Sequence, residues 1–123
     1  MAVELNHIIV PSHDKVGSSQ FLAAILGIDP PQAAGHFMGL RVANGVTLDY
    51  DDADEFRPQH YAFTVDDDEY DAIFERVTAA GITFFADPSH RRSGEVNHRN
   101  GGRGFYFADP DGHNMEVFTT GPS

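Results

Sequence analysis

The order of the predicted elements occurs twice along this 123-residue chain, and this repeat limits the possible folds more than any other feature. A first module spans about 1–52, a second spans about 59–120, and residues 53–58 read as a linker. Each module begins with a strand and a helix and ends in two or three strands. The predicted ranges are strand 3–10, helix 13–27, strands 36–43 and 46–52, then strand 60–65, helix 66–81, strand 82–86 and a hairpin over 103–119.

Turn and stop signals mark the ends of these elements. Gly27 and Gly81 end the two apolar-striped helices, because glycine tolerates the left-handed backbone of a helix C-terminus. Asn44-Gly45 and the run 109–112, Asp-Pro-Asp-Gly, are typical of hairpin turns. The pattern predicts one α+β domain over 1–123, built from two tandem βαβββ modules. Its curved mixed sheets would enclose a cavity, with the helices outside.

Composition excludes several classes of partner. The formal net charge is −11, and nucleic acid or an anionic membrane surface requires basic patches instead. No apolar run approaches the ~20 residues that span a bilayer, and the N-terminus has no signal-peptide pattern. There is no cysteine, so thiolate and disulfide chemistry are excluded. We therefore expect a cytoplasmic protein.

Polar side chains occupy the strand faces that the helices do not cover. Alternation along a strand places His7 and His60 on these faces of the two opening strands, and Glu116 on that of the last strand. By order of elements, Glu116 corresponds to Thr47, with Asp49 two residues further on. If the sheets curl around a shared cavity, His7, His60 and Glu116 converge. Two imidazoles and a carboxylate suit one divalent Fe, Mn, Ni or Zn ion per site.

The opening "LNHIIV", the second opening "HYAFTV" and the closing "FYFADPDGHNMEVF" together resemble the vicinal oxygen chelate superfamily. This group holds glyoxalases, extradiol dioxygenases, fosfomycin-resistance enzymes and metal-free bleomycin-resistance proteins. The resemblance implies metal ligands at His7, His60 and Glu116. It also implies a homodimer, in which modules pair within or between chains. Glyoxalases use a fourth, carboxylate ligand where this chain has Thr47, which favours a three-ligand member.

The function expected from this resemblance is metal-dependent chemistry on a small molecule chelated through adjacent oxygens. Lyase, dioxygenase and thiol-transferase reactions all remain open. The alternative is a metal-free protein that sequesters a small, cationic ligand, which the acidic charge would suit. Salt-sensitive binding of a cationic drug by metal-free protein would favour that alternative.

The loop 87–102 concentrates cations in an acidic chain, and loops on a rigid scaffold commonly carry binding groups. We expect it to cover the cavity mouth, although it could equally neutralise the acidic run that begins the second helix. His98 is the candidate proton-transfer residue, and His113 is expected to be structural. The other candidate substrate contacts are Thr47, Asp49, Arg91, Arg92, Arg99 and Phe105.

Overall fold

A computed structural model describes residues 2–121. The chain divides into two compact units, the first ending at Arg57 and the second beginning at Pro58. The boundary lies in the segment that the sequence marks as a linker. Within residues 2–121, no helix combines the length and apolarity that crossing a membrane requires.

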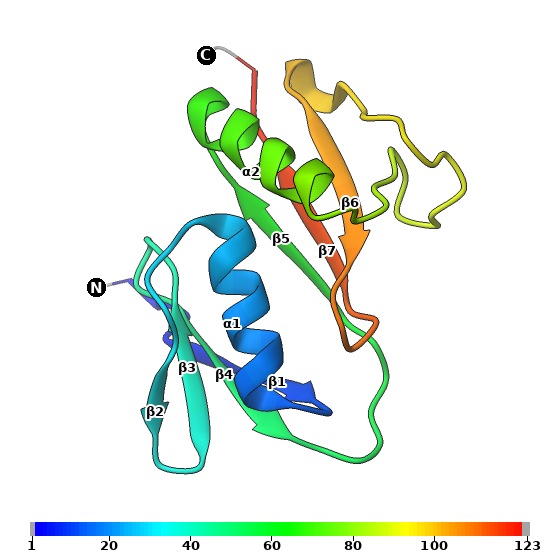
Figure 1. The fold of residues 1–123 in the computed structure, drawn as a ribbon. Coiled ribbons are helices and arrows are strands. Elements are labelled where there is room, and N and C mark those ends of the chain that lie inside the picture. Colours follow the sequence, from blue (N-terminus) through cyan, green and yellow to red (C-terminus); the bar gives the residue numbers. More distant parts are fainter. Residues whose placement is uncertain (1, 122–123) are drawn as a thin grey trace. The chain divides into compact units, whose positions relative to one another are not determined.

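The first unit has one helix and a four-stranded mixed sheet (Figure 1). In spatial order the strands are β1, β4, β3 and β2; β1 runs parallel to β4, and the other neighbours are antiparallel. A parallel pair needs a crossover connection, which α1, β2 and β3 provide. The elements are β1 (His7–Ser12), α1 (Lys15–Leu26), β2 (Gln32–Ala34), β3 (Phe37–Arg41) and β4 (Thr47–Asp52).

Helix α1 begins two residues later than predicted, at Lys15, and ends at the predicted glycine. The Asp14 side chain caps its start by accepting a hydrogen bond from the Gly17 backbone, and Gly27 ends it in the left-handed region at φ 70°. The helix buries Leu22 and Ile25. On the sheet the buried apolar residues are Val10, Leu40, Leu48 and Tyr50, which share one face. The opposite face, which carries His7, Thr47 and Asp49, is left uncovered by α1.

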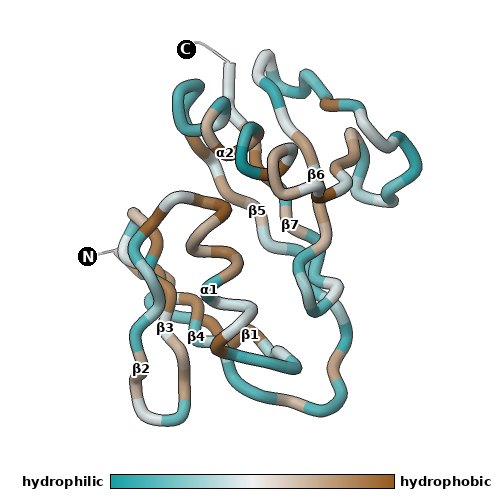
Figure 2. The backbone as a smooth tube through the Cα atoms, viewed as in Figure 1, coloured by the Kyte–Doolittle hydropathy of each residue, from teal (hydrophilic) through white to brown (hydrophobic). Residues whose placement is uncertain are grey.

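The second unit has a three-stranded sheet in the order β5, β7, β6. Strand β5 is parallel to β7, and β6 and β7 form the predicted antiparallel hairpin. The strands include brown, hydrophobic stretches in Figure 2, whereas the loop 87–102 is mostly teal, or hydrophilic. The elements are β5 (His60–Thr64), α2 (Asp67–Ala79), the 3-10 turn η1 (Arg99–Gly101), β6 (Gly104–Ala108) and β7 (Asn114–Phe118).

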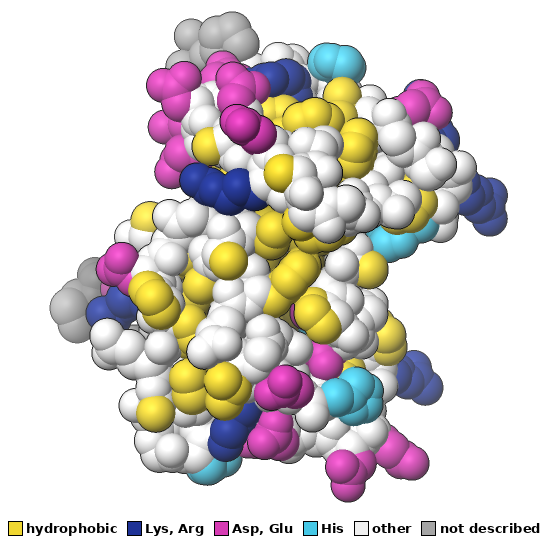
Figure 3. All heavy atoms as spheres, in the orientation of Figure 1, with side chains coloured by type: hydrophobic (Ala, Val, Ile, Leu, Met, Phe, Trp, Pro, Cys, Tyr) yellow, Lys and Arg dark blue, Asp and Glu magenta, His cyan; other side chains and the backbone are white. Residues whose placement is uncertain are grey.

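Helix α2 is fixed at its start by a capping box. Asp66 accepts from the Glu69 backbone at 2.8 Å, and Glu69 accepts from the Asp66 backbone at 2.9 Å. Acidic side chains gather over this end (Figure 3), where the helix dipole favours negative charge. The buried face of α2 packs on β6, and the Tyr70 and Phe105 rings lie 5.5 Å apart, edge to face.

Two local expectations are wrong. Residues 82–86 are not a strand of the described structure: Phe85 alone forms bridges, to Tyr106 and Ser93. The chain turns directly after this segment, because the Asp87 carboxylate accepts hydrogen bonds from the Arg91 and Arg92 backbones. The short strand β2 was missed, because its three residues follow prolines and carry no alternating pattern.

Candidate functional site

Strands β5 and β7 bring His60 and Glu116 together on the face opposite α2. Ala62 is the register partner of Glu116, and His60, two residues earlier, points to the same face. The His60 Nε2 and Glu116 Oε1 atoms lie 3.0 Å apart. The Glu116 side chain is 16% exposed and that of His60 is 47% exposed. The pair therefore opens to solvent from the imidazole side, while the carboxylate is held within the sheet face.

Tyr106 and Arg99 extend this pair into a chain of contacts. Tyr106 is the register partner of Glu116 on β6, and its hydroxyl forms a hydrogen bond with the Glu116 carboxylate. The Arg99 guanidinium donates to the same hydroxyl oxygen at 2.9 Å. Since that hydroxyl oxygen accepts a hydrogen bond from Arg99, its own O–H is directed to Glu116.

The electrostatics of Tyr106 agree with this direction. Tyr106 is 2% exposed, and burial is the largest cause that raises the pKa of its phenol; the Glu116 charge adds to it, and Arg99 opposes it. The neutral phenol is thus favoured at physiological pH. Tyr106 acts as a hydrogen-bond donor toward the carboxylate.

A second contact ties the loop 87–102 to the same face. His90 donates from Nε2 to the Asn114 side-chain oxygen at 2.8 Å, and the Asn114 amide donates to the Pro88 carbonyl at 3.1 Å. The His90 ring stacks on Phe85 with a 4.2 Å centroid separation. His90 also holds a left-handed backbone at φ 58°, a conformation that costs energy outside glycine. Because Asn114 is opposite His60 in register, the loop is anchored beside the pair.

The register of the first unit corrects the predicted equivalence between the modules. His7 pairs with Thr47, and Ile9 pairs with Asp49, whereas in the second unit His60 pairs with Asn114, and Ala62 with Glu116. With His7 matched to His60, the counterpart of Glu116 is therefore Asp49. The prediction that Thr47 holds this place is wrong by two residues, because counting elements cannot fix a strand register. The first unit therefore has a carboxylate at the matched position, so Thr47 no longer favours a three-ligand member.

His7 has the tautomer that a metal ligand needs. Its Nδ1 donates to the Asn6 side-chain oxygen at 2.9 Å, which leaves the lone pair on Nε2. His7 belongs to the first unit, so its convergence with His60 and Glu116 stays a prediction.

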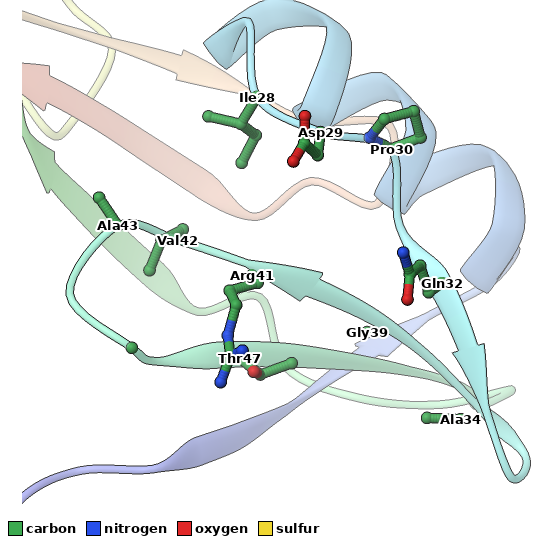
Figure 4. A pocket seen from close by; sticks show the side chains of 11 residues that line it. Ile28, Asp29, Pro30, Gln32, Ala34, Gly39, Arg41, Val42, Ala43 and Thr47 are labelled. Atoms are coloured by element: carbon green, nitrogen blue, oxygen red, sulfur yellow. The ribbon is translucent and has the colours of Figure 1, made fainter.

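A cavity of about 940 Å³ opens within the first unit. Gly39, Arg41 and Thr47 line it from the face that carries His7, and Ile28, Asp29 and Pro30 lie across from them (Figure 4). Such a volume accommodates a drug-sized molecule. Thr47, a predicted substrate contact, is therefore in a cavity wall. The remaining lining residues are Gln32, Ala34, Val42, Ala43 and Gly45.

One predicted substrate residue is on the wrong face. Phe105 is fully buried among the aromatic rings beneath α2, and its neighbour Tyr106 takes the face with Glu116. Strict alternation from Glu116 across the hairpin would have identified Tyr106. His90 and Asn114 were also missed; His90 carried no sequence signal beyond its place in the loop.

The remaining predicted loop residues lie at the surface. His98 is exposed and precedes η1 without a side-chain cap to it. Arg92 pairs with Glu95 at 2.9 Å, and Arg91 is exposed. Among the contacts described for Arg91, Arg92, His98 and Arg99, only that of Arg99 reaches the Tyr106–Glu116 pair. Arg99 donates a hydrogen bond to the Tyr106 hydroxyl.

A second group with metal-ligand chemistry occurs in the β6–β7 turn. Asp109, Asp111 and His113 place ligand-type atoms within 4.8 Å of one another. His113 Nδ1, however, accepts a hydrogen bond from the Gln59 backbone at 2.9 Å, so its neutral ring carries the proton on Nε2 and offers no lone pair. His113 is structural, as its place beside the turn suggested.

The His60–Glu116 pair fits a divalent first-row ion. Two atoms bound about 2.1 Å from one ion at a right angle lie roughly 3 Å apart, and the His60 Nε2 to Glu116 Oε1 distance is 3.0 Å. One nitrogen and one oxygen donor without sulfur match such ions. Metal binding would replace the proton that His60 shares with Glu116.

Comparison with known proteins identifies the family. The model of the Glyoxalase/Bleomycin resistance protein/Dioxygenase superfamily matches residues 4–117. The chain belongs to this superfamily. It is 30% identical to the glutathione transferase FosA of Serratia marcescens, over 95% of this chain and 81% of that protein. Solved structures of the oxidases ChaP-H1 and ChaP-H2 are each 51% identical; the TM-scores are 0.94 and 0.95, covering 96% and 99% of this chain and 96% and 100% of theirs.

These relatives confirm the predicted fold and class of function. The chain is a metal-dependent enzyme of the glyoxalase and dioxygenase type that acts on a small molecule. The metal-free sequestering protein is not favoured, because relatives over nearly the full chain include a transferase and two oxidases.

Proposed function

We propose that this chain is an oxidase of a small molecule with two adjacent oxygens, and that His7, His60 and Glu116 hold its divalent metal. The observation that carries the metal site is the His60–Glu116 pair, with 3.0 Å between its donor atoms on the sheet face opposite α2. A bound metal would act as a Lewis acid that polarises the substrate oxygens. The oxidase assignment is supported by 51% identity to two oxidases over almost the whole chain.

The other predicted polar residues would then bind the substrate or transfer a proton. Thr47 and Asp49 would position the substrate from the first unit, where Thr47 lines the cavity. Arg91 and Arg92 would attract an anionic substrate oxygen from the loop, since the rest of the protein is strongly acidic. His98, exposed on the same loop, would transfer a proton between substrate and solvent.

A thiol transferase is the second candidate. Its support is the 30% identity to FosA, whose alignment covers 81% of that protein. The two candidates differ in what they consume: an oxidase needs an electron acceptor such as molecular oxygen, whereas a transferase needs a thiol.

We also propose a homodimer in the cytoplasm. The exposed large apolar side chains of the described residues fall mostly on the N-terminal segment and β1, an edge strand. An unpaired edge with apolar side chains is a common site of association between chains. These residues are Val3, Leu5, Ile8 and Ile9. Light scattering on Ile9→Lys beside the native protein tests the dimer, and a monomeric native protein contradicts it.

The proposed site is tested by metal content. We expect about one transition metal per chain by plasma mass spectrometry after reconstitution, and loss of it in His7→Ala, His60→Ala and Glu116→Ala. His13→Ala is the matched control, because the His13 ring contacts Phe56 and is not one of the proposed ligands. This variant should keep its metal. Retention of metal by Glu116→Ala would contradict the site. Oxygen uptake with catechols and related vicinal-oxygen compounds, compared with thiol consumption, separates oxidase from transferase.

A further inference from the structure

Glu116 contacts two protein groups, and a third group contacts one of these two. His60 lies at one side, at 3.0 Å from Oε1, and the Tyr106 hydroxyl supplies a hydrogen bond from the neighbouring strand. Arg99 stands behind Tyr106 at 2.9 Å. When a metal takes the place of the proton shared with His60, the Tyr106 contact is the described hydrogen bond that still orients the carboxylate.

We propose that Tyr106 and Arg99 are positioning residues that set the metal affinity of Glu116 by fixing the orientation of its carboxylate. This inference rests on the proposed metal site. Partners behind a ligand typically change metal affinity by about 10–100-fold when removed. The effect arises because a ligand without such a partner loses rotational freedom only when the metal binds.

The burial of Tyr106 makes its hydroxyl a firm support. The residue is 2% exposed, and its register pairing with Glu116 fixes the approach of the two side chains. A buried hydroxyl needs hydrogen-bond partners, and the described ones are Glu116 and Arg99. The Arg99 guanidinium also lies 5.8 Å from the centre of the Tyr106 ring, which adds a cation–π attraction.

Arg99 connects the loop to the site by this route. It lies in η1, next to Asn100 at the left-handed φ 54°, and Asn97, two residues before it, donates to the Ala86 carbonyl at 2.9 Å. The hydrogen bond of Asn97 holds the loop in place next to Arg99, and Arg99 in turn donates to the Tyr106 hydroxyl. This contact differs from the one expected from the sequence, in which Arg99 met the substrate directly.

Calorimetric titration of metal-free protein with Mn(II) and with Zn(II) tests the inference. We expect Tyr106→Phe to lower affinity about 10–100-fold and Arg99→Ala to lower it about 3–10-fold, with the native melting curve of the metal-free protein retained. Tyr61→Phe is the matched control, because it removes a hydroxyl from the same sheet on the opposite face, beside Met115. This control should bind metal as the native protein does.

The variants separate failure of the inference from failure of the metal site. If Glu116→Ala binds metal like the native protein, the proposed site is overturned and the inference with it. If Glu116→Ala loses the metal but Tyr106→Phe and Arg99→Ala bind normally, the inference alone is overturned. If Tyr106→Phe is unfolded, the Arg99→Ala variant tests the inference instead, because Arg99 is exposed. A drop in its metal affinity of threefold or more supports the inference, and an unchanged affinity refutes it.

Discussion

Replacing Asp109 should separate the structural role of the β6–β7 turn from a metal-binding role. The Oδ1 atom of Asp109 accepts hydrogen bonds from the backbones of Asp111 at 3.0 Å and His113 at 2.8 Å. Asp109 is 6% exposed and His113 is fully buried. Asp109→Ala would leave a buried backbone N–H without its acceptor, which costs about 1–3 kcal/mol. Asp109→Asn keeps an oxygen at that place, so we expect it to cost less than about 1 kcal/mol.

The two variants should also differ from the native protein in their response to pH. Burial is the main cause that raises the pKa of Asp109 above 3.8. A group with a raised folded-state pKa stabilises the fold below its unfolded pKa, and this contribution is lost as pH rises through the folded pKa. Asp109→Asn does not titrate, so its stability relative to native protein should increase as pH rises from below 3.8.

Urea unfolding followed by circular dichroism, between pH 3 and pH 7, measures both effects. For a chain of this length, a loss of about 2 kcal/mol corresponds to a melting shift of roughly 5–10 °C. Equal destabilisation by Asn and Ala would refute the acceptor role of Oδ1. Stabilisation of native protein by Zn(II) or Ca(II) that disappears in Asp109→Asn, with Glu116→Ala unaffected, would refute the structural reading of this turn.

Two further predictions concern the second unit. Arg103 bonds to Asp67 at 2.9 Å and Asp71 at 2.8 Å and lies 4.2 Å from the Tyr70 ring, so Arg103→Ala should cost about 1–3 kcal/mol in chemical unfolding. Arg103→Lys should recover part of this unfolding free energy. If the destabilisation of Arg103→Ala vanishes entirely in 1 M NaCl, the contact with the ring is contradicted. A Cβ atom on Gly102 would lie 1.9 Å from the Thr119 carbonyl oxygen, so Gly102→Ala should cost more than about 3 kcal/mol. Gly112→Ala, at φ 83° with nothing within 4 Å, should cost about 1 kcal/mol, and a smaller loss for Gly102→Ala than for this control would exclude the clash.

The sequence was sufficient where local chemistry decides structure. The stripes of α1 and α2, the glycine stop of α1 and the turn at 109–112 gave both helices and the final hairpin within a few residues. Alternation along the strands correctly assigned His60 and Glu116 to the face opposite the helix, because period two is a property of every extended chain.

The sequence was insufficient where pairing between distant segments determines the structure. The segment 82–86 is apolar enough for a strand, yet only Phe85 bridges to Tyr106, because hydrogen bonds to Asp87 turn the chain away. Asp49 and Thr47 lie on one face, and only the register with β1 shows which one matches Glu116. His90 is held by backbone conformation and by Asn114, which no short-range pattern encodes.

The corrected register also shows that the residues facing the matched carboxylates differ between the two units. Gly39 pairs with Asp49 in the first unit as Tyr106 pairs with Glu116 in the second. A Cβ atom at Gly39 would come within 3.2 Å of the Asp49 carboxylate, so this position leaves room instead of a supporting hydroxyl, and it lines the cavity. Glu116, by contrast, is braced by Tyr106. The first unit thus has space beside its carboxylate, whereas the second unit has a supporting hydroxyl at the matched position.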